Sequence, residues 1–189
     1  MKAVFLDRDG TIGGTGGGMH PFDFSMYDFA PKAIKSLNEI GVKVFLFTNQ
    51  TRVGRGYFTE DELLKGFKMM EEELAFHSAF LDGIYYCPHK PNDGCECQKP
   101  NIGLLLKAKE MYNLNLEECY VVGDTGGSDM LAANKAGAKK VLVKTGWGEG
   151  SLTKYRYEWQ EVEPDYIADN LVNAVSWISN DLNKNKNKK

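Results

Sequence analysis

The chain has 189 residues and a formal net charge of −3; 42% of its residues are hydrophobic and 26% are charged. This composition is typical of a globular protein with a substantial core, and it excludes a strongly basic protein that binds nucleic acid through its overall charge. No stretch approaches the roughly 20 apolar residues that span a bilayer. We expect a cytoplasmic protein that is a monomer, with one domain over residues 1–180 and a basic flexible tail over 181–189.

Short β-rich runs alternate with segments of helical periodicity along the chain. Strands are predicted at residues 2–7, 42–47, 83–86, 119–123 and 140–144, and helices at 31–40, 59–77, 101–112 and 128–136. Pro31 and Gly41 mark the ends of the first helix, and Thr59 with Glu62 forms a capping box at the start of the second. The alternation predicts βαβ units and therefore an α/β fold with a central parallel sheet.

Two carboxylates, Asp7 and Asp9, and a glycine, Gly10, follow the first predicted strand. Both side chains reach the open end of the strand, because the glycine allows the chain to turn there. Carboxylate oxygens are suitable ligands for a hard cation such as Mg²⁺. The competing interpretation is an acidic turn or a helix N-cap that follows a strand.

Four segments together resemble the haloacid dehalogenase (HAD) superfamily of aspartate-nucleophile phosphatases. They are Asp7-Arg8-Asp9-Gly10-Thr11, the strand that ends in Thr48-Asn49-Gln50, Lys99-Pro100, and Val121-Val122-Gly123-Asp124 with Asp129 five residues on. They occur in the order of that superfamily. The resemblance implies a three-layer Rossmann-like fold, with the catalytic pieces at the C-terminal ends of the strands, where open α/β sheets bind their ligands.

The chemistry of phosphoryl transfer gives each of these residues a role. Asp7 would attack phosphorus and form an aspartyl-phosphate, while Asp9 would protonate the leaving alkoxide and then activate the hydrolytic water. Thr48 and the backbone amides beside it would donate hydrogen bonds to phosphate oxygens, and Lys99 would neutralise negative charge. Taken alone, Lys99 is equally compatible with a solvated surface lysine.

A magnesium site is expected from the same set of residues. Asp7, Asp124 and the backbone carbonyl of Asp9 would hold Mg²⁺. Asp129 lies too far along the chain to be assumed a direct ligand, so we assign it to orienting Lys99 or a metal-bound water.

Three sulfurs and one imidazole lie within eleven residues of each other, in Cys87, His89, Cys95 and Cys97. A closed structural zinc site takes four such ligands, and the prolines and the glycine of the loop allow it to fold around an ion. The alternatives are a disulfide, which the Cys-x-Cys spacing disfavours, and reduced thiols in a loop. The sequence therefore predicts a structural zinc, with Cys119 in the core.

The order Cys-x-His, Cys-x-Cys and Lys-Pro resembles the branch of the superfamily that contains histidinol-phosphate and heptose-bisphosphate phosphatases. That branch lacks a large cap domain, so short loops would select the substrate. Two positions depart from its pattern: Gln98 replaces the usual arginine, and Arg52 stands where glycine is typical. The residues that we expect to bind substrate are Thr11, Asn49, Arg52, Arg55 and Gln98.

The glycine-rich segment over residues 12–21 lacks the lysine of a nucleotide-binding P-loop. It is either a flap over the site, with His20, Phe22 and Phe24 near the substrate, or a disordered surface loop. Trp147 follows the fifth predicted strand and either lines the pocket or packs against its neighbours.

These features predict a magnesium-dependent phosphomonoesterase that acts on a small phosphorylated metabolite, such as a sugar phosphate or an amino-alcohol phosphate. The alternatives are a phosphatase of nucleic-acid ends, which would need a basic groove with aromatic surfaces, and a noncatalytic module that binds zinc or carries a phospho-aspartate. We expect neither a membrane nor a nucleic acid as a partner.

Overall fold

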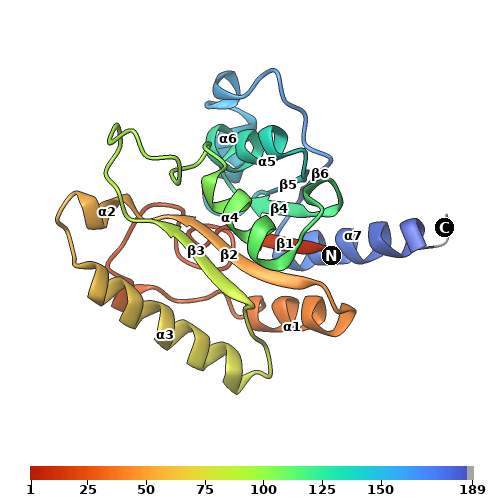
Figure 1. Ribbon diagram of the computed structural model, residues 1–189, viewed down its shortest axis with the longest axis horizontal. Helices are drawn as coiled ribbons and strands as arrows, with labels where there is room; N and C mark the ends of the chain where they lie inside the picture. The colour runs from red at the N-terminus through yellow and green to blue at the C-terminus, as the bar shows by residue number, and fades with distance from the viewer. Residues whose placement is uncertain (187–189) are drawn as a thin grey trace.

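The computed structural model describes residues 1–186 and the side chains of residues 1–184. A six-stranded parallel sheet forms its centre, in the order β3-β2-β1-β4-β5-β6 (Figure 1). The strands are β1 (Ala3–Leu6), β2 (Lys43–Asn49), β3 (Gly83–Cys87), β4 (Tyr120–Gly123), β5 (Lys139–Val143) and β6 (Tyr166–Ala168). The parallel α/β fold predicted from the alternation of elements is therefore confirmed.

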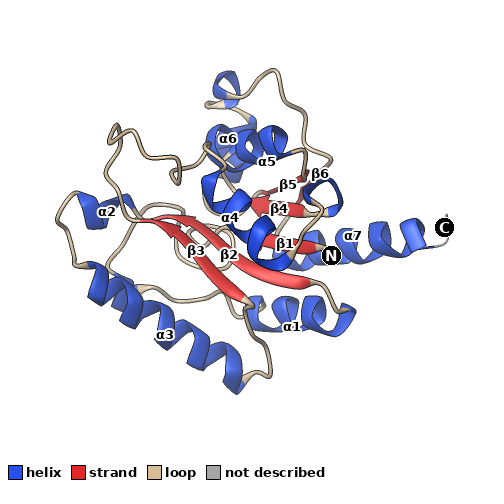
Figure 2. Cartoon of the chain, in the orientation of Figure 1, coloured by secondary structure: helices blue, strands red, loops and turns tan. Residues whose placement is uncertain are grey.

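Helices cover both faces of the sheet (Figure 2). They are α1 (Ala30–Ile40), α2 (Thr51–Gly54), α3 (Glu60–Phe76), α4 (Gly103–Tyr112), α5 (Leu131–Ala136), α6 (Gly148–Leu152) and α7 (Leu171–Lys186). The buried side chains of α1, α3 and α7 pack on one face, and those of α4 and α5 pack on the other. The result is a three-layer sandwich.

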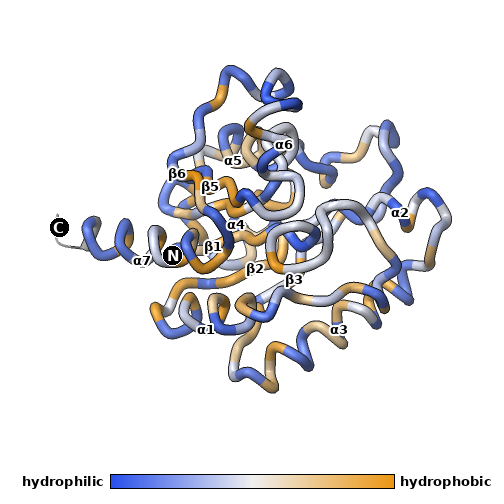
Figure 3. The backbone as a smooth tube through the Cα atoms, turned by 180° about the vertical axis from the view of Figure 1, so that it is seen from behind, coloured by the Kyte–Doolittle hydropathy of each residue, from blue (hydrophilic) through white to orange (hydrophobic). Residues whose placement is uncertain are grey.

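Successive residues of each strand supply opposite faces of the sheet. In β1, Val4 and Leu6 join the cluster under α1, α3 and α7, whereas Ala3 and Phe5 join the cluster under α4 and α5. Burial on both sides makes the strands continuously apolar, as a parallel sheet requires. The hydropathy of the chain shows this as hydrophobic strands between mixed helices (Figure 3).

The helix ends follow the predicted signals. Thr59 Oγ1 accepts a hydrogen bond from the Glu62 amide at 3.1 Å, and a Glu62 carboxylate oxygen accepts one from the Thr59 amide at 2.8 Å. Gly41 ends α1 with φ +84°, a conformation that glycine adopts without strain. The predicted capping box and glycine stop are confirmed.

Several elements differ from the sequence prediction. Helices α2, α6 and α7 and strand β6 were not predicted, and the helix expected over 128–136 is a π-helical turn, Gly126–Met130, that continues into α5. No helix within the described residues has the length and apolar character needed to cross a membrane.

The flexible tail predicted over residues 181–189 is wrong for residues 181–186, because α7 continues through Lys186. Leu182 is 2% exposed and packs in the core, and the Tyr120 hydroxyl donates to Asp181 at 2.6 Å. Residues 187–189 lie outside the described residues. The assignment of residues 1–180 to a single domain stays a prediction.

Replacement of Leu182 should test whether this last part of α7 contributes to the fold. Leu182→Ala removes buried apolar surface, so we expect the free energy of unfolding to fall by about 2 kcal/mol. The control Asn183→Ala changes an exposed neighbour and should alter it by no more than about 0.5 kcal/mol. Urea denaturation of both variants measures the difference; equal effects would show that the helix end does not pack as described.

Candidate active site

The C-terminal ends of three adjacent strands meet at one pocket. β1 pairs with β2 on one side and with β4 on the other, and the Asp7 amide extends the second pairing by donating to Val122 O at 2.9 Å. A cavity of about 300 Å³ opens at this edge. Its lining residues are Asp7, Asp9, Gly16, Gly18, Asn49, Gln50, Thr51, Arg52, Arg55, Lys99, Asp124, Thr125 and Ser128.

Lys99 is buried at the floor of this pocket. Its ammonium donates to Asp7 Oδ1 at 2.9 Å, to Asp129 Oδ1 at 2.7 Å and to the backbone oxygen of Phe47 at 2.8 Å. Burial lowers the pKa of Lys99, but the carboxylates of Asp129 and Asp7 outweigh burial and the net pKa is raised. Lys99 therefore stays protonated. Because its side chain is buried and paired with two carboxylates, the alternative of a solvated surface lysine is wrong.

Carboxylates crowd around this single ammonium. Oxygens of Asp7, Asp124 and Asp129 lie within 4.8 Å of one another. Burial raises the pKa of Asp7 to about 7 and that of Asp124 to about 8, and repulsion between the carboxylates adds to both shifts. A hard divalent cation would relieve this repulsion, and oxygen ligands at this spacing suit it. The donor set therefore fits Mg²⁺.

Backbone geometry brings Asp124 against the first motif. Gly10 has φ +88°, and a Cβ built there would lie 2.0 Å from Asp124 Oδ2, so glycine is required for this close approach. The Asp124 carboxylate also accepts hydrogen bonds from the Trp147 amide at 2.8 Å and from Thr125 Oγ1 at 3.0 Å. These contacts fix the carboxylate beside the pocket.

Asp9 points toward two residues that the sequence analysis did not include in the site. Arg8 Nε and Nη2 donate to the two oxygens of the Asp9 carboxylate at 3.1 and 3.2 Å, and Gln50 Nε2 donates to Asp9 Oδ2 at 3.1 Å. The Arg8 side chain is 1% exposed. The sequence contains a signal for the pairing of Arg8 with Asp9, because an arginine that stands between two aspartates after a buried strand needs a charged partner if it is buried too.

Thr48 and Asn49, which we expect to bind phosphate and substrate, form hydrogen bonds with Gln50 and Lys99. Thr48 Oγ1 is buried and accepts a hydrogen bond from Gln50 Nε2 at 2.9 Å. Asn49 lines the pocket and also binds the backbone of Lys99, donating to its oxygen at 3.2 Å and accepting from its amide at 2.9 Å. Asn49 therefore fixes the loop that carries Lys99.

The other expected substrate-binding residues divide into two groups. Arg52 and Arg55 line the pocket at α2, with the Arg52 guanidinium 5.0 Å from the centre of the Tyr57 ring. Gln98 is not among the lining residues. Thr11 is fully buried, and its Oγ1 has no hydrogen-bond partner in the described part of the chain.

The glycine-rich segment lies at the pocket mouth, where Gly16 and Gly18 line it. Its aromatic neighbours have other roles: Phe24 packs 4.6 Å from the Arg8 guanidinium, and the His20 ring accepts a hydrogen bond from the Phe22 amide at 3.2 Å. Trp147 is 46% exposed and lines a neighbouring cavity of about 330 Å³.

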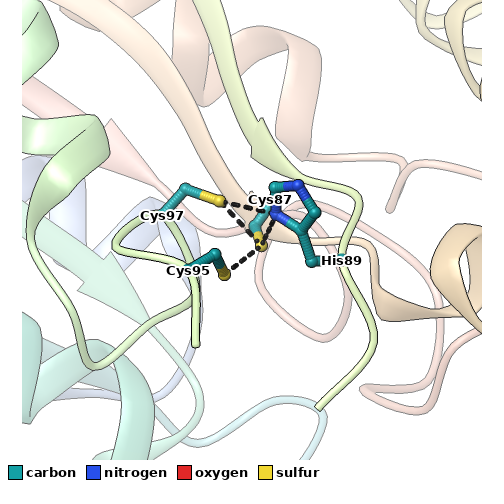
Figure 4. Close-up of side chains that lie close together, drawn as sticks. All are labelled: Cys87, His89, Cys95 and Cys97. Atoms are coloured by element: carbon teal, nitrogen blue, oxygen red, sulfur yellow. Dashed lines mark hydrogen bonds between the residues drawn. The ribbon is translucent and has the colours of Figure 1, made fainter. Parts of the chain in front are cut away.

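The four predicted zinc ligands converge at the end of β3, which supplies Cys87, and in the loop that follows it (Figure 4). Cys87 Sγ lies 3.0 Å from Cys97 Sγ and 3.6 Å from Cys95 Sγ, and His89 Nδ1 lies 3.1 Å from Cys97 Sγ. All three cysteines are free thiols. Three sulfurs and one ring nitrogen, all within 4.8 Å of one another, match the ligand set of a tetrahedral zinc site.

Comparison with known proteins agrees with this geometry. Residues 96–174 match the family model described as HAD-hydrolase-like. The match lies over the part of the chain that carries Lys99, Asp124 and Asp129, and it agrees with the parallel sheet and the aspartate pocket at its carboxyl edge.

Sequence similarity to named enzymes identifies the family within this class of hydrolases. The chain is 42% identical over 155 residues to the D-glycero-beta-D-manno-heptose-1,7-bisphosphate 7-phosphatase of Yersinia pestis. The aligned region covers 77% of this chain and 82% of that relative. It is 40% identical over 191 residues to the enzyme of the same name from Escherichia coli strain K12, with coverage of 96% and 90%. The chain therefore belongs to the HAD-type phosphatases, which hydrolyse phosphoric monoesters. Within them it belongs to the family of the heptose-1,7-bisphosphate 7-phosphatases.

A solved structure of that family has the same architecture. The D,D-heptose 1,7-bisphosphate phosphatase from B. bronchiseptica, crystallised with magnesium and phosphate, aligns with a TM-score of 0.86 and 29% identity. The alignment covers 96% of this chain and 99% of that one. The likeness therefore extends over nearly the whole of both chains.

The raised pKa values of Asp7 and Asp124 predict a pH-dependent stability of the metal-free protein. Between about pH 4 and pH 8 the folded state retains protons that the unfolded chain has lost, so the free energy of unfolding should fall as pH rises through this window. Asp124→Asn removes one of these groups and should make the fall shallower. Mg²⁺ should restore stability at pH 8, because it binds the ionised carboxylates of the folded state.

Urea denaturation in chelator at several pH values measures this effect. Asp28→Asn, which changes an exposed carboxylate outside the pocket, serves as the matched control and should keep the slope of the wild type. A wild type and an Asp124→Asn variant with the same slope would contradict the prediction.

Proposed function

We propose that this protein is a magnesium-dependent phosphatase that removes one phosphate from a sugar bisphosphate of the heptose-1,7-bisphosphate type. The observation that carries the proposal is the pairing of Asp7 with a buried, protonated Lys99 in a pocket that also holds Asp124. A carboxylate beside a fixed cation can approach an anionic phosphoryl group, because the cation offsets the charge that both bring.

Arg52 and Arg55 at the pocket favour a substrate that carries a second anionic group. Arg52 and Arg55 line the mouth, whereas the buried Lys99 lies at the floor with the carboxylates. A guanidinium binds phosphate through several N–H donors, so this rim suits the phosphate that is not transferred. Arg52 thereby provides a positive charge at the pocket in a chain that carries Gln98 where its branch usually has arginine.

The chain's own residues account for both half-reactions. Asp7 attacks phosphorus, the bond to the sugar oxygen breaks, and Asp9 gives its proton to that oxygen. Asp9, now ionised, takes a proton from the water that attacks the aspartyl-phosphate, which releases inorganic phosphate and restores Asp7. Thr48 and Lys99 stabilise the charge on the transferred oxygens.

Two metal ions complete this proposal. Asp7, Asp124 and the backbone carbonyl of Asp9 would hold Mg²⁺, which supplies positive charge for the phosphoryl oxygens. Cys87, His89, Cys95 and Cys97 would hold a structural zinc. Zinc needs reduced thiols, which is consistent with a cytoplasmic protein.

Phosphate release from a panel of substrates tests the function. In Mg²⁺, wild type should hydrolyse a heptose or related sugar bisphosphate in preference to sugar monophosphates, nucleotides and DNA ends. Asp7→Asn should lose at least about 10³-fold in kcat because the nucleophile is gone, and Asp9→Asn should also be severely impaired. The control Asp28→Asn should retain wild-type rates. Release that persists in Asp7→Asn, or that favours DNA ends, would contradict the proposal.

Metal analysis tests the zinc site. Purified protein should contain about one zinc per chain, and Cys95→Ser should lose it and unfold at a lower temperature, because a structural metal contributes directly to folding. Cys119→Ser, which changes the cysteine outside the cluster, should keep its zinc. A zinc-free wild type of unchanged stability would contradict the site.

A further inference from the structure

The amide of Gln50 lies among three polar side chains at the edge of the pocket. Its Nε2 donates to Asp9 Oδ2 at 3.1 Å and to Thr48 Oγ1 at 2.9 Å, while its Oε1 accepts from Arg8 Nη2 at 3.2 Å. Gln50 is 5% exposed and lines the pocket. One amide therefore contacts both the expected acid/base and the expected phosphate donor.

The chemistry of the neighbours fixes which way this amide faces. An arginine side chain has only donors, so the Gln50 atom that faces Arg8 must be the oxygen. Asp9 Oδ2 already accepts a hydrogen bond from Arg8 Nε, so the Gln50 atom that faces this oxygen must be the nitrogen. Rotating the amide by 180° would lose both contacts and place like groups against each other.

Arg8 is itself firmly held. It makes two hydrogen bonds to Asp9, and its guanidinium lies 4.6 Å from the centre of the Phe24 ring and 5.8 Å from that of Phe67. A buried guanidinium with planar partners has little freedom to turn. The orientation of Gln50 is therefore fixed by a rigid neighbour.

This orientation determines the direction of the Thr48 hydroxyl. The NH₂ group of Gln50 can only donate, so Thr48 Oγ1 must be the acceptor in their hydrogen bond. The single proton of the hydroxyl must then point elsewhere, and over residues 1–186 it has no acceptor. Thr48 is 1% exposed and is not itself a lining residue, but Asn49 and Gln50 beside it line the pocket. A phosphoryl oxygen bound against these two residues would supply the acceptor that this proton lacks.

We propose that Gln50, oriented by Arg8, is a positioning residue that makes Thr48 a hydrogen-bond donor to the transferred phosphoryl group and holds the Asp9 carboxylate beside it. The inference builds on the proposed phosphatase function and extends it to two residues outside the predicted catalytic set. A single amide thereby links phosphate binding to acid/base chemistry.

Two substitutions of Gln50 separate positioning from simple packing. Gln50→Glu keeps the shape and still accepts from Arg8, but it has no N–H, so the Thr48 proton turns toward the new carboxylate and away from phosphate. Gln50→Met keeps the approximate size and leaves the hydroxyl free to turn toward phosphate. If Gln50 only fills space, Gln50→Glu should bind phosphate as well as Gln50→Met or better. If Gln50 positions the Thr48 hydroxyl, Gln50→Glu should bind phosphate more weakly than Gln50→Met.

The first readout is the affinity for inorganic phosphate in Mg²⁺, measured by calorimetry, because phosphate binding needs Thr48 but not acid/base chemistry. We expect the affinity to fall by about 10-fold or more in Gln50→Glu, as for the loss of one hydrogen bond to a charged group, and by clearly less in Gln50→Met. The second readout is kcat and KM on the sugar bisphosphate hydrolysed by wild type, where Glu should reduce kcat more than Met does.

The control is the same pair of substitutions in a Thr48→Val background. If Gln50 acts through the Thr48 hydroxyl, the difference in phosphate affinity between Glu and Met should largely disappear there, and it should return in Thr48→Ser. A difference that is unchanged in Thr48→Val would come from the added charge alone and would overturn the inference.

The outcomes for this inference and for the proposed function are distinct. An active wild type whose Gln50 variants bind phosphate equally well contradicts the positioning role alone. A wild type that neither binds phosphate nor hydrolyses any sugar bisphosphate contradicts the proposed function, and the positioning role with it. Circular dichroism and the unfolding temperature of each variant identify those in which misfolding, rather than misdirected hydrogen bonding, causes the loss.

Discussion

The site depends on one buried ammonium that lies among more carboxylates than it can neutralise. Lys99 contacts Asp7 and Asp129, and Asp124 lies within reach of both carboxylates. Removing such charges from water is costly, and only close, well-aligned partners offset that cost. The negative charge that remains has two consequences: it adds to burial, which is the main cause, in raising the pKa values of Asp7 and Asp124, and it makes the pocket a suitable site for a divalent cation. The remaining features of the fold serve to hold this group of charges in place.

The loop that carries Lys99 is distant in sequence from the strands that it meets, so it needs anchors of its own. Asn49 at the end of β2 makes two hydrogen bonds to the Lys99 backbone. The cysteine and histidine cluster lies just before it and joins the loop to the end of β3. The same loop also supports α2, because a Cβ on Gly54 would lie 2.3 Å from the Lys90 amide. A metal in this cluster would therefore stabilise both the loop of Lys99 and the helix of Arg52 and Arg55, without contact with the carboxylates of the pocket.

Much of this arrangement could be predicted from the sequence, because parallel strands present their carboxyl ends at one edge and the motif residues follow those ends. The elements that were missed have weaker signals. β6 has three residues, and α7 carries its apolar positions, such as Ile178 and Leu182, among many asparagines and lysines. Gln50 and Arg8 were missed for a different reason. Spacing predicts which strand end a residue occupies, but not which hydrogen bonds its side chain makes, and those bonds depend on contacts between segments about forty residues apart.

The structure separates the chemistry of the site from the selection of substrate. The groups that we propose to react are held by one another: Lys99 donates to Asp7, and Gln50 links Asp9 to Thr48, so a change in any of them would disturb its partners. Arg52 and Arg55 instead lie on a short helix at the more exposed rim, with few contacts that the chemistry depends on. A substitution at this rim can therefore change which second anionic group is bound while the phosphoryl-transfer residues keep their geometry. For this reason we expect the departure from the branch at Arg52 to bear on specificity more than on the reaction.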